Sequence, residues 1–208
     1  MAPRIAANWR LANLGAAPRR RVKPQPVMTM LITPPRKTIA LVGLKGVGKS
    51  SIGRRLATAL GLPFRDADTE IEAAAGETIS DIFTLFGEAA FRDGERRVIG
   101  RLLDEPPHVL ATGGGAFVQN DTRNLIKQKA ISVWLKADLQ ILARRVARRD
   151  NRPLLFGKDP ITVLQAHVRE RYPAFEQADV VVETGEAAHQ VAVDSIISAL
   201  AAHMAKPT

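Results

Sequence analysis

The sequence I-A-L-V-G-L-K-G-V-G-K-S occupies residues 39–50 and decides how the rest of the chain is interpreted. Its first four residues form a short apolar run that is typical of a buried strand. Residues 43–50 then match the pattern G-x-x-x-x-G-K-[ST] at every fixed position. A helical pattern follows, with Ile52 and Leu56 on one face and Gly61 as a C-terminal stop. We therefore predict a strand, a phosphate-binding loop and a helix in direct succession.

The spacing of this loop favours a specific chemistry. Glycines let the backbone turn tightly and point its N–H groups inward, where they can bind an anion. The positive end of the helix dipole faces the same place. Lys49 would contact the β- and γ-phosphates of a nucleotide, and the hydroxyl of Ser50 would bind Mg²⁺. The alternative is a glycine-rich turn without a ligand, which the complete motif in its strand–loop–helix context disfavours.

Composition limits the class of protein. A chain of 208 residues with 46% apolar residues is expected to form one domain with a buried core, and at most an appendage. No stretch approaches eighteen consecutive apolar residues, so we expect no membrane span. The sequence has no cysteine, which excludes disulfides and thiolate chemistry. This fits a reducing compartment, and we expect a cytoplasmic protein.

The net charge of +9 is unevenly distributed. Residues 1–36 contain seven basic residues and no acid, whereas residues 37–208 hold 23 Lys and Arg against 21 Asp and Glu, a net charge of +2. Because residues 1–36 contain several prolines and the run Arg19-Arg20-Arg21 but no serine, we expect a basic, disordered N-terminal extension rather than an organelle transit peptide. We expect no specific nucleic-acid partner and a monomer.

Four more apolar runs follow the first helix and alternate with helical patterns. Strands are predicted at 62–68, 108–111, 131–135 and 178–184. Helices are predicted at 69–75, from Ser80 as its cap to about 102, and at 120–128, 138–149, 161–171 and 187–202. This alternation predicts an α/β fold with a five-stranded parallel sheet covered on both faces. We therefore expect residues 37–204 to form a three-layer α/β/α P-loop kinase-type domain.

Two acids end the second predicted strand. Asp66 and Asp68 are two positions apart, so on an extended segment both carboxylates would face the same way. Ligands bind beyond the carboxyl ends of strands in such sheets. The structural alternative is that Asp68 caps the helix 69–75, and the two interpretations are compatible.

Two further segments stand out by their glycines, prolines and arginines. Three glycines, Gly113 to Gly115, follow the third strand and imply that something approaches the backbone closely. The sequence leaves open whether this is a ligand or another part of the chain. Residues 149–160 are basic, bounded by proline and glycine and without periodicity, which suggests a mobile lid that carries Arg152.

Residues 37–202 resemble shikimate kinase. The resemblance rests on six motifs in the same order: the phosphate loop, Asp66-Ala67-Asp68, G-E-x-x-F-R at 87–92, the three glycines at 113–115, Arg152-Pro153-Leu154-Leu155, and Arg171 followed by Tyr172-Pro173. A phosphate loop alone is shared by many NTPases, and the six together are far more specific. The resemblance implies ATP-dependent phosphorylation of the 3-hydroxyl of shikimate.

The resemblance also implies roles for individual residues. Asp68 would orient or deprotonate the substrate hydroxyl, while Arg92 and Arg171 would hold the shikimate carboxylate. Arg152 would reach the phosphates with the lid, and Asp66 would hold a water bound to Mg²⁺, of which Ser50 is a direct ligand. The expected catalytic residues are Lys49, Asp68 and Arg152. The expected ATP-binding residues are Gly46, Val47, Gly48, Lys49, Ser50, Ser51, Arg145 and Arg152. The expected substrate-binding residues are Asp68, Arg92, Gly113, Gly114, Gly115 and Arg171.

Two other functions compete with this expectation. A gluconate or nucleoside-monophosphate kinase would share the phosphate loop and an arginine-bearing lid, but the other motifs argue against it. A nucleotide-regulated binding module would use residues 1–36 to bind nucleic acid or an anionic membrane surface. That segment offers charge but no recognisable motif.

Overall fold

The computed structural model describes residues 35–149, 160–185 and 188–206, without the side chains of 145–149 and 160. Residues 1–34 of the predicted extension and nearly all of the predicted lid lie outside this part of the chain. The strands are β1 Thr38–Val42, β2 Phe64–Asp66, β3 Val109–Ala111, β4 Ala130–Ala137 and β5 Val180–Thr184. The helices are α1 Lys49–Leu60, α2 Ala67–Ala75, α3 Ile79–Leu103, α4 Asn120–Lys129, α5 Leu139–Arg149, α6 Pro160–Phe175 and α7 His189–Met204, with a short 3₁₀ turn η1 at Ala116–Val118.

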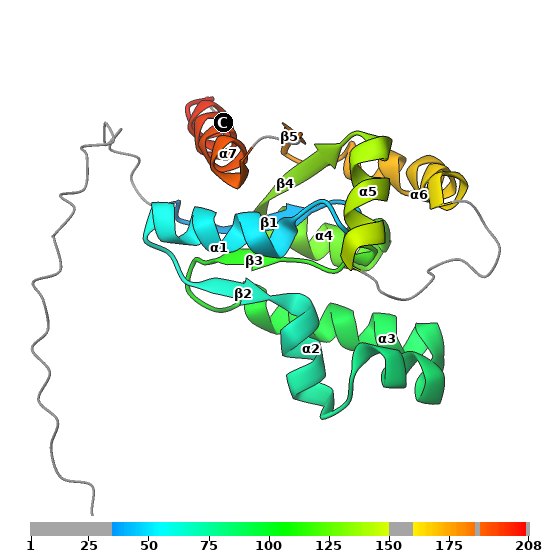
Figure 1. The fold of residues 1–208 in the computed structure, drawn as a ribbon. Coiled ribbons are helices and arrows are strands. Elements are labelled where there is room, and N and C mark those ends of the chain that lie inside the picture. The colour runs from blue at the N-terminus through cyan, green and yellow to red at the C-terminus, as the bar shows by residue number, and fades with distance from the viewer. Residues whose placement is uncertain (1–34, 150–159, 186–187, 207–208) are drawn as a thin grey trace, which may run out of the picture. The chain divides into compact units, whose positions relative to one another are not determined.

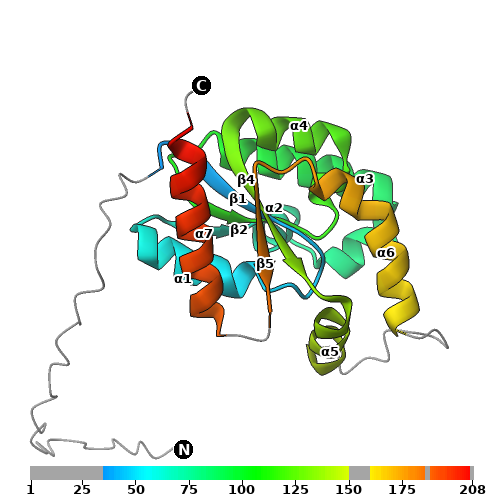
Figure 2. The ribbon, with the colours of Figure 1, turned by 90° about the horizontal axis from the view of Figure 1, so that it is seen from above.

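The five strands form one parallel sheet in the order β2-β3-β1-β4-β5. Figures 1 and 2 show α1 and α7 on one face and α3, α4 and α6 on the other, so the predicted three-layer α/β fold is confirmed. β1 leads into α1 on one face, whereas its neighbour β3 leads through η1 into α4 on the other. The loops after β1 and β3 thus lead to opposite faces of the sheet and diverge at its centre. Sheets of this kind bind their ligands at such a point.

The register of the sheet brings three predicted motifs to the same level. Leu41 of β1 pairs with Ala111 of β3, and Ala111 pairs with Asp66 of β2. The phosphate loop, the three glycines and the Asp66–Asp68 segment therefore leave the sheet side by side. All five residues of β1 are buried, as expected for the central strand of a sheet that is covered on both faces.

Aromatic packing extends α6 beyond its predicted end. The sequence predicted that the helix stops before Tyr172-Pro173, but α6 continues to Phe175 with Pro173 inside it. Phe175 is fully buried and stacks on Trp134 of β4, with ring centroids 5.9 Å apart, and Tyr172 meets the edge of the same indole at 4.9 Å. This burial offsets the backbone hydrogen bond that proline removes.

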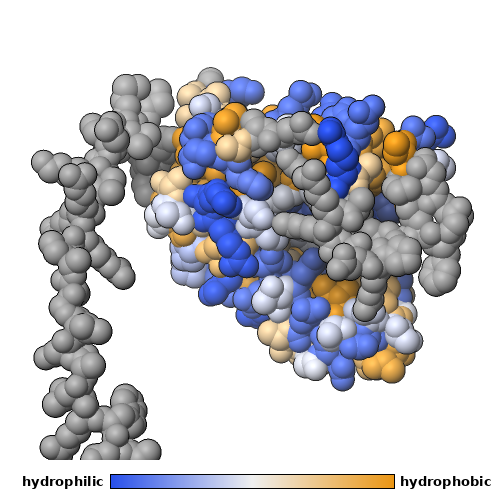
Figure 3. All heavy atoms as spheres, in the orientation of Figure 1, coloured by the Kyte–Doolittle hydropathy of each residue, from blue (hydrophilic) through white to orange (hydrophobic). Residues whose placement is uncertain are grey.

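The long helix α3 also differs from its prediction in two ways. Its cap is Thr78 rather than Ser80, since the Thr78 hydroxyl accepts a hydrogen bond from the Asp81 N–H and donates one to the Asp81 carboxylate. Gly87 has a positive φ of 78° and breaks α3 into two parts. Before this break Leu85 and Phe86 are 63% exposed, so they do not belong to the core, and apolar surface is visible at this end of the domain in Figure 3. None of the described helices is long and apolar enough to span a membrane.

A side-chain clamp joins the N-terminal ends of β4 and β5. The Asp179 carboxylate accepts hydrogen bonds from the Ser132 N–H at 2.8 Å and from its hydroxyl at 2.6 Å, while the Asp179 N–H donates to the Ser132 hydroxyl at 2.9 Å. Asp179→Ala should lower the free energy of unfolding by about 1–3 kcal/mol, because it leaves buried donors of Ser132 unpaired. Urea denaturation measures this loss.

The matched control is Glu183→Ala on the same strand. Glu183 is exposed and pairs with Lys136 at 3.9 Å. Its replacement should change stability by less than about 0.5 kcal/mol. Equal losses in the two variants would contradict the proposed clamp.

Candidate active site

The phosphate loop has the backbone conformation that its glycines were expected to allow. Gly43, Gly46 and Gly48 all have positive φ angles, and Gly48 caps α1. At Gly43 the requirement is also steric, since a Cβ there would lie 2.6 Å from the Leu135 carbonyl oxygen of β4. The Ile52 N–H donates the first hydrogen bond of α1, to the Gly48 carbonyl oxygen. The N–H groups of the first turn before Ile52 therefore point toward the loop.

Lys49 is buried inside the curve of this loop. Its ammonium donates hydrogen bonds to the carbonyl oxygens of Gly43 at 2.8 Å and Leu44 at 3.1 Å. Burial lowers the pKa of Lys49 to about 8, although the negative charges of Asp68 and Asp66 oppose this shift. The positive charge of Arg171 lowers the pKa further, which shows that α6 brings this guanidinium to the same side of the domain.

The two acids after β2 lie together for a different reason than the one predicted. The segment is not extended through Asp68, because α2 begins at Ala67 and Asp66 is its cap. The Asp66 carboxylate accepts a hydrogen bond from the Asp68 N–H at 3.2 Å. The expectation that Asp68 caps the helix is therefore wrong. The first turn of α2, rather than strand alternation, turns Asp68 toward the phosphate loop.

The pKa of Asp68 is raised above its ordinary value. Burial is the main cause, and the negative charges of Asp66 and Glu72 add to it. The positive charges of Lys49 and Lys45 act in the opposite direction. Asp68 is thus a carboxylate at the surface of the site whose pKa is raised by desolvation, and the two lysines of the phosphate loop oppose this rise.

The three glycines after β3 are where the parts of the site meet. A Cβ at Gly113 would lie 2.6 Å from Oε1 of Glu95 and 3.1 Å from Oδ1 of Asp68. A Cβ at Gly114 would lie 3.1 Å from the backbone nitrogen of Lys45. The question that the sequence left open is answered in part, because protein groups approach these two positions closely.

The third of these glycines lies against Arg92 of α3. A Cβ at Gly115 would come within 2.7 Å of the Arg92 guanidinium. That guanidinium donates to Oε2 of Glu95 at 2.7 Å and to Glu88 at 3.2 and 3.3 Å. Arg92 is half-buried at this point, so two carboxylates and the glycine backbone fix its position.

Glu95 is the site residue that the sequence analysis missed. It is fully buried, and its Oε1 has no hydrogen-bond partner among the described residues. Burial raises the pKa of Glu95, and the charge of Asp68 raises it further, while Arg92 lowers it. A signal was present: Glu95 falls at helical spacing between Phe91 and Ile99, which are both buried. An acid at a core position of a helix needs a partner, and Arg92 is three residues before it.

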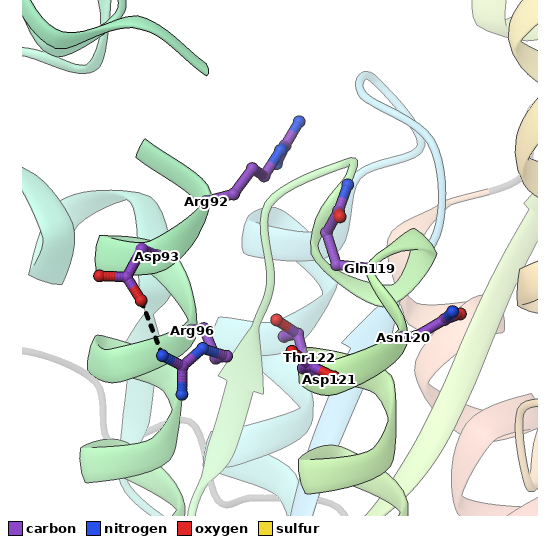
Figure 4. Close-up of a pocket in the computed structure, with 7 residues that line it drawn as sticks. All are labelled: Arg92, Asp93, Arg96, Gln119, Asn120, Asp121 and Thr122. Carbon is purple, nitrogen blue, oxygen red and sulfur yellow. Dashed lines mark hydrogen bonds and ion pairs between the residues drawn. The ribbon is translucent and has the colours of Figure 1, made fainter. Parts of the chain in front are cut away.

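A polar cavity of about 480 Å³ lies beside Arg92, between α3 and the start of α4 (Figure 4). Asp93 and Arg96 form an ion pair at 2.7 Å on its α3 wall. Residues of the phosphate loop do not line it. The cavity therefore lies beside the site built around Asp68 and the three glycines, and Arg92 borders both.

Most of the predicted site residues are brought to one region. The phosphate loop, Asp66, Asp68, Arg92 and the glycines at 113–115 surround the carboxyl ends of β1, β2 and β3, and the charge of Arg171 reaches Lys49. Arg152 lies outside the described residues, as does the side chain of Arg145 in α5.

The described residues include no group of three or more acidic or histidine side chains that could hold a metal ion. Oxygen donors near the loop include the Ser50 hydroxyl and the Asp66 carboxylate. Both are hard oxygen ligands, and Mg²⁺ commonly binds one or two such groups together with phosphate oxygens and water. The donor set thus fits a Mg²⁺ ion that arrives with a nucleotide.

Comparison with known proteins identifies the family of this chain. The family model for shikimate kinase matches residues 45–201. A shikimate kinase from Caulobacter vibrioides is 70% identical over 164 residues, which cover 79% of this chain and 82% of that protein. A shikimate kinase from Paramagnetospirillum magneticum is 52% identical over 168 residues, which cover 81% and 86%.

Solved structures that resemble this chain also include shikimate kinases. The structure of a shikimate kinase from Acinetobacter baumannii in complex with shikimate matches with a TM-score of 0.77 and 36% identity, and covers 83% of this chain and 97% of that one. A gluconokinase from Sinorhizobium meliloti has a TM-score of 0.53 and 22% identity over 80% of this chain and 93% of its own. At that identity the second match shows a shared fold alone.

The raised pKa of Glu95 predicts a pH-dependent stability difference. Between the ordinary carboxyl pKa and the raised value, the folded state binds more protons than the unfolded state, so wild-type stability falls as the pH rises through this window. Glu95→Gln removes the titrating group and with it this loss of stability at higher pH. We expect its stability relative to wild type to be more favourable at pH 7.5 than at pH 5 in urea denaturation.

Glu88→Gln is the matched control, because Glu88 bonds the same arginine from an exposed position. Its stability relative to wild type should change little between the two pH values. A pH-independent difference for Glu95→Gln would contradict the costly burial of this carboxylate.

Proposed function

This chain belongs to the shikimate kinase family, and we propose that it transfers the γ-phosphoryl group of ATP to the 3-hydroxyl of shikimate. The observation that carries the proposal is the meeting of the phosphate loop, the Asp68 carboxylate and the fixed guanidinium of Arg92 at Gly113–Gly115. In the reaction a bond forms between the 3-oxygen and the γ-phosphorus, and the bond from that phosphorus to the β–γ bridging oxygen breaks. The products are shikimate 3-phosphate and ADP.

The phosphate loop supplies the ATP-binding half of the site. The amides of the loop, from Gly46 to the first turn of α1 at Ser51, would bind the phosphates. Lys49 would turn from the carbonyls of Gly43 and Leu44 to the β- and γ-phosphates. Mg²⁺, held by Ser50 and through water by Asp66, would neutralise charge that develops on the phosphate oxygens.

Asp68 is the proposed base. Phosphoryl transfer depends mainly on positioning and charge stabilisation, so the proton of the alcohol can leave late. Asp68 would orient the 3-hydroxyl and accept its proton. The raised pKa of Asp68 favours this role, since it brings the carboxylate closer in basicity to a neutral operating pH.

Arg92 and Arg171 are proposed to bind the shikimate carboxylate. A guanidinium matches a carboxylate with two parallel hydrogen bonds, provided that its plane is fixed. The buried Glu95 fixes the guanidinium plane of Arg92, because its Oε2 lies 2.7 Å from Nη1 of Arg92. We propose Glu95 as a positioning residue for Arg92, with the backbone of Gly113, Gly114 and Gly115 lying along the substrate.

Two arginines of the lid region complete the proposal. Arg152 would approach the transferred phosphoryl group when the segment 149–160 closes over it, and closure would exclude water that otherwise hydrolyses ATP. Arg145 would lie over the adenine ring. The partners of the protein are then two small molecules, and we propose that it acts as a monomer.

An ATP-consumption assay with three acceptors tests the function. We expect ATP-dependent turnover with shikimate, and none above background with gluconate or nucleoside monophosphates. The shikimate 3-phosphate formed should match the ADP released in a one-to-one ratio. Turnover with gluconate or a monophosphate alone would overturn the assignment and leave a kinase of the same fold with another acceptor.

Replacing Arg92 by Lys tests the carboxylate site. The ammonium cannot reproduce the planar pair of hydrogen bonds, each of which is worth about 1.5–3 kcal/mol to a charged group. We expect the KM for shikimate to rise about tenfold or more, with a smaller effect on kcat and on the KM for ATP. Steady-state kinetics measure all three.

Arg96→Lys is the control for this substitution. Arg96 lies one turn further along α3, where it is 41% exposed and pairs with Asp93. Its KM for shikimate should stay within about twofold of wild type. A change well under tenfold for Arg92→Lys would remove Arg92 from the proposed site.

The lowered pKa of Lys49 predicts proton uptake on nucleotide binding. In the free protein Lys49 is half protonated near pH 8, and bound phosphates would stabilise its charged form. Binding of MgATP at pH 8 should therefore take up about half a proton at this site, and much less at pH 6.5. Calorimetry in buffers of different ionisation enthalpy measures the uptake. In Lys49→Arg the guanidinium stays charged throughout, so the same uptake in both proteins would contradict the assignment.

A further inference from the structure

Four aromatic rings pack together next to the proposed site, and they come from three different elements. Phe117 lies in η1, Trp134 in β4, and Tyr172 and Phe175 in the last turn of α6. Phe175 stacks on Phe117 and on Trp134, with ring centroids 6.4 and 5.9 Å apart. Tyr172 meets Trp134 in a T-shaped pair at 4.9 Å. We call these four residues the aromatic cluster.

The aromatic cluster reaches the phosphate loop through Trp134. In the sheet Trp134 pairs with Val42, the last residue of β1. A Cβ at Gly43, the first residue of the loop, would lie 3.5 Å from Cδ1 of the indole. The carbonyl oxygen of Gly43 accepts a hydrogen bond from the Lys49 ammonium at 2.8 Å. The indole therefore packs against the stretch of backbone that holds Lys49.

The aromatic cluster also holds the turn of α6 that carries Arg171. Pro173 lies inside this turn and has no N–H, so the turn lacks one backbone hydrogen bond. A proline also disfavours the helical conformation of the residue before it, which is Tyr172. Backbone hydrogen bonds alone therefore hold this turn weakly. The burial of Phe175 and the contact of Tyr172 with Trp134 supply the stabilisation that keeps it helical.

The guanidinium of Arg171 is restrained less directly than that of Arg92. Among the described residues Arg171 pairs with Glu170, but its Nε lies 4.0 Å from Oε2 of this largely exposed residue. An exposed pair of this length restrains a side chain little. Arg92, in contrast, lies 2.7 Å from the buried Glu95. The position of Arg171 therefore depends on how firmly its helical turn is held.

From this arrangement, and resting on the proposed function, we propose that Tyr172 is a positioning residue for the arginine that binds the shikimate carboxylate. The ring of Tyr172 sets the place of Arg171 relative to the phosphate loop, because it packs on the same indole as Gly43. The role belongs to the ring rather than to the hydroxyl. Loss of the ring should weaken acceptor binding through Arg171 and leave the phosphate loop in place.

Tyr172→Leu tests the proposal, because it removes the ring and keeps an apolar side chain. We expect the KM for shikimate to rise about three- to tenfold, the range that one aromatic pair supports. The values of kcat and of the KM for ATP should stay within about threefold of wild type. Tyr172→Phe keeps the ring and should stay within about twofold of wild type in all three constants.

Ile196→Val is the control for a modest loss of core packing. Ile196 is fully buried on α7, which packs against α1 and β5 rather than against α6. Its KM for shikimate should stay within about twofold of wild type, because distant sites act independently. An equal rise in the KM of Ile196→Val and Tyr172→Leu would show that lost stability alone is responsible, and would overturn the positioning role.

A measurement without turnover separates this proposal from the proposed function. The side-chain ¹⁵Nε–¹H signal of Arg171, assigned by its loss in Arg171→Lys, reports the order of the guanidinium in the ligand-free protein through its heteronuclear NOE. A lower NOE in Tyr172→Leu, with Tyr172→Phe equal to wild type, supports the positioning role even if shikimate is not the acceptor. An equal NOE in all three proteins would overturn it. So would an unchanged KM of Tyr172→Leu for shikimate, provided that the wild type phosphorylates shikimate.

Discussion

The site depends on one steric constraint, the absence of side chains at Gly113–Gly115. Each of these glycines leaves room for a different charged residue or its backbone: Glu95 and Asp68 at the first, Lys45 at the second and Arg92 at the third. The register between β1, β2 and β3 sets the level at which these groups meet, but the distance between them is set by the missing Cβ atoms. A methyl group at Gly114 would clash with the backbone of the phosphate loop at Lys45, and one at Gly113 or Gly115 would displace the side chains of Glu95, Asp68 or Arg92. Phosphoryl transfer tolerates little misplacement.

The same closeness has an energetic cost that the rest of the domain must offset. Burial lowers the pKa of Lys49 and raises those of Asp68 and Glu95. The charged form of each group is therefore less stable, relative to its neutral form, than it would be in water. The charges partly stabilise one another across the site. The remainder is supported by a sheet whose central strand is completely buried and by helices packed on both of its faces. The packing of the domain thus stabilises a set of charged groups that are already oriented before a ligand binds.

Much of this arrangement could be predicted from the sequence, and the exceptions have physical reasons. The order of strands, loops and helices follows from local patterns, and the phosphate loop is specified by glycines whose conformation few other residues adopt. The extension of α6 through Pro173 could not be predicted, since it depends on an aromatic cluster that only the fold assembles. The cap of α2 was misassigned because Asp66 and Asp68 are both good caps. Glu95 was missed although it falls at helical spacing between the apolar residues Phe91 and Ile99, because charged residues of this helix were assigned to its solvated face.

The two carboxylates on Arg92 explain how a guanidinium can be both fixed and available. A free arginine would be mobile, and a fully paired one would have no donors to offer a substrate. Here Glu95 is buried and holds one side at 2.7 Å, whereas Glu88 is largely exposed and bonds more loosely, at 3.2 and 3.3 Å. An exposed pair of this kind contributes little free energy, so an incoming carboxylate can replace Glu88 at small cost. If the incoming carboxylate displaced Glu95 instead, the buried carboxylate of Glu95 would lose its partner. The asymmetry lets the fold orient the arginine in advance and leaves its outer face for the carboxylate that we propose it binds.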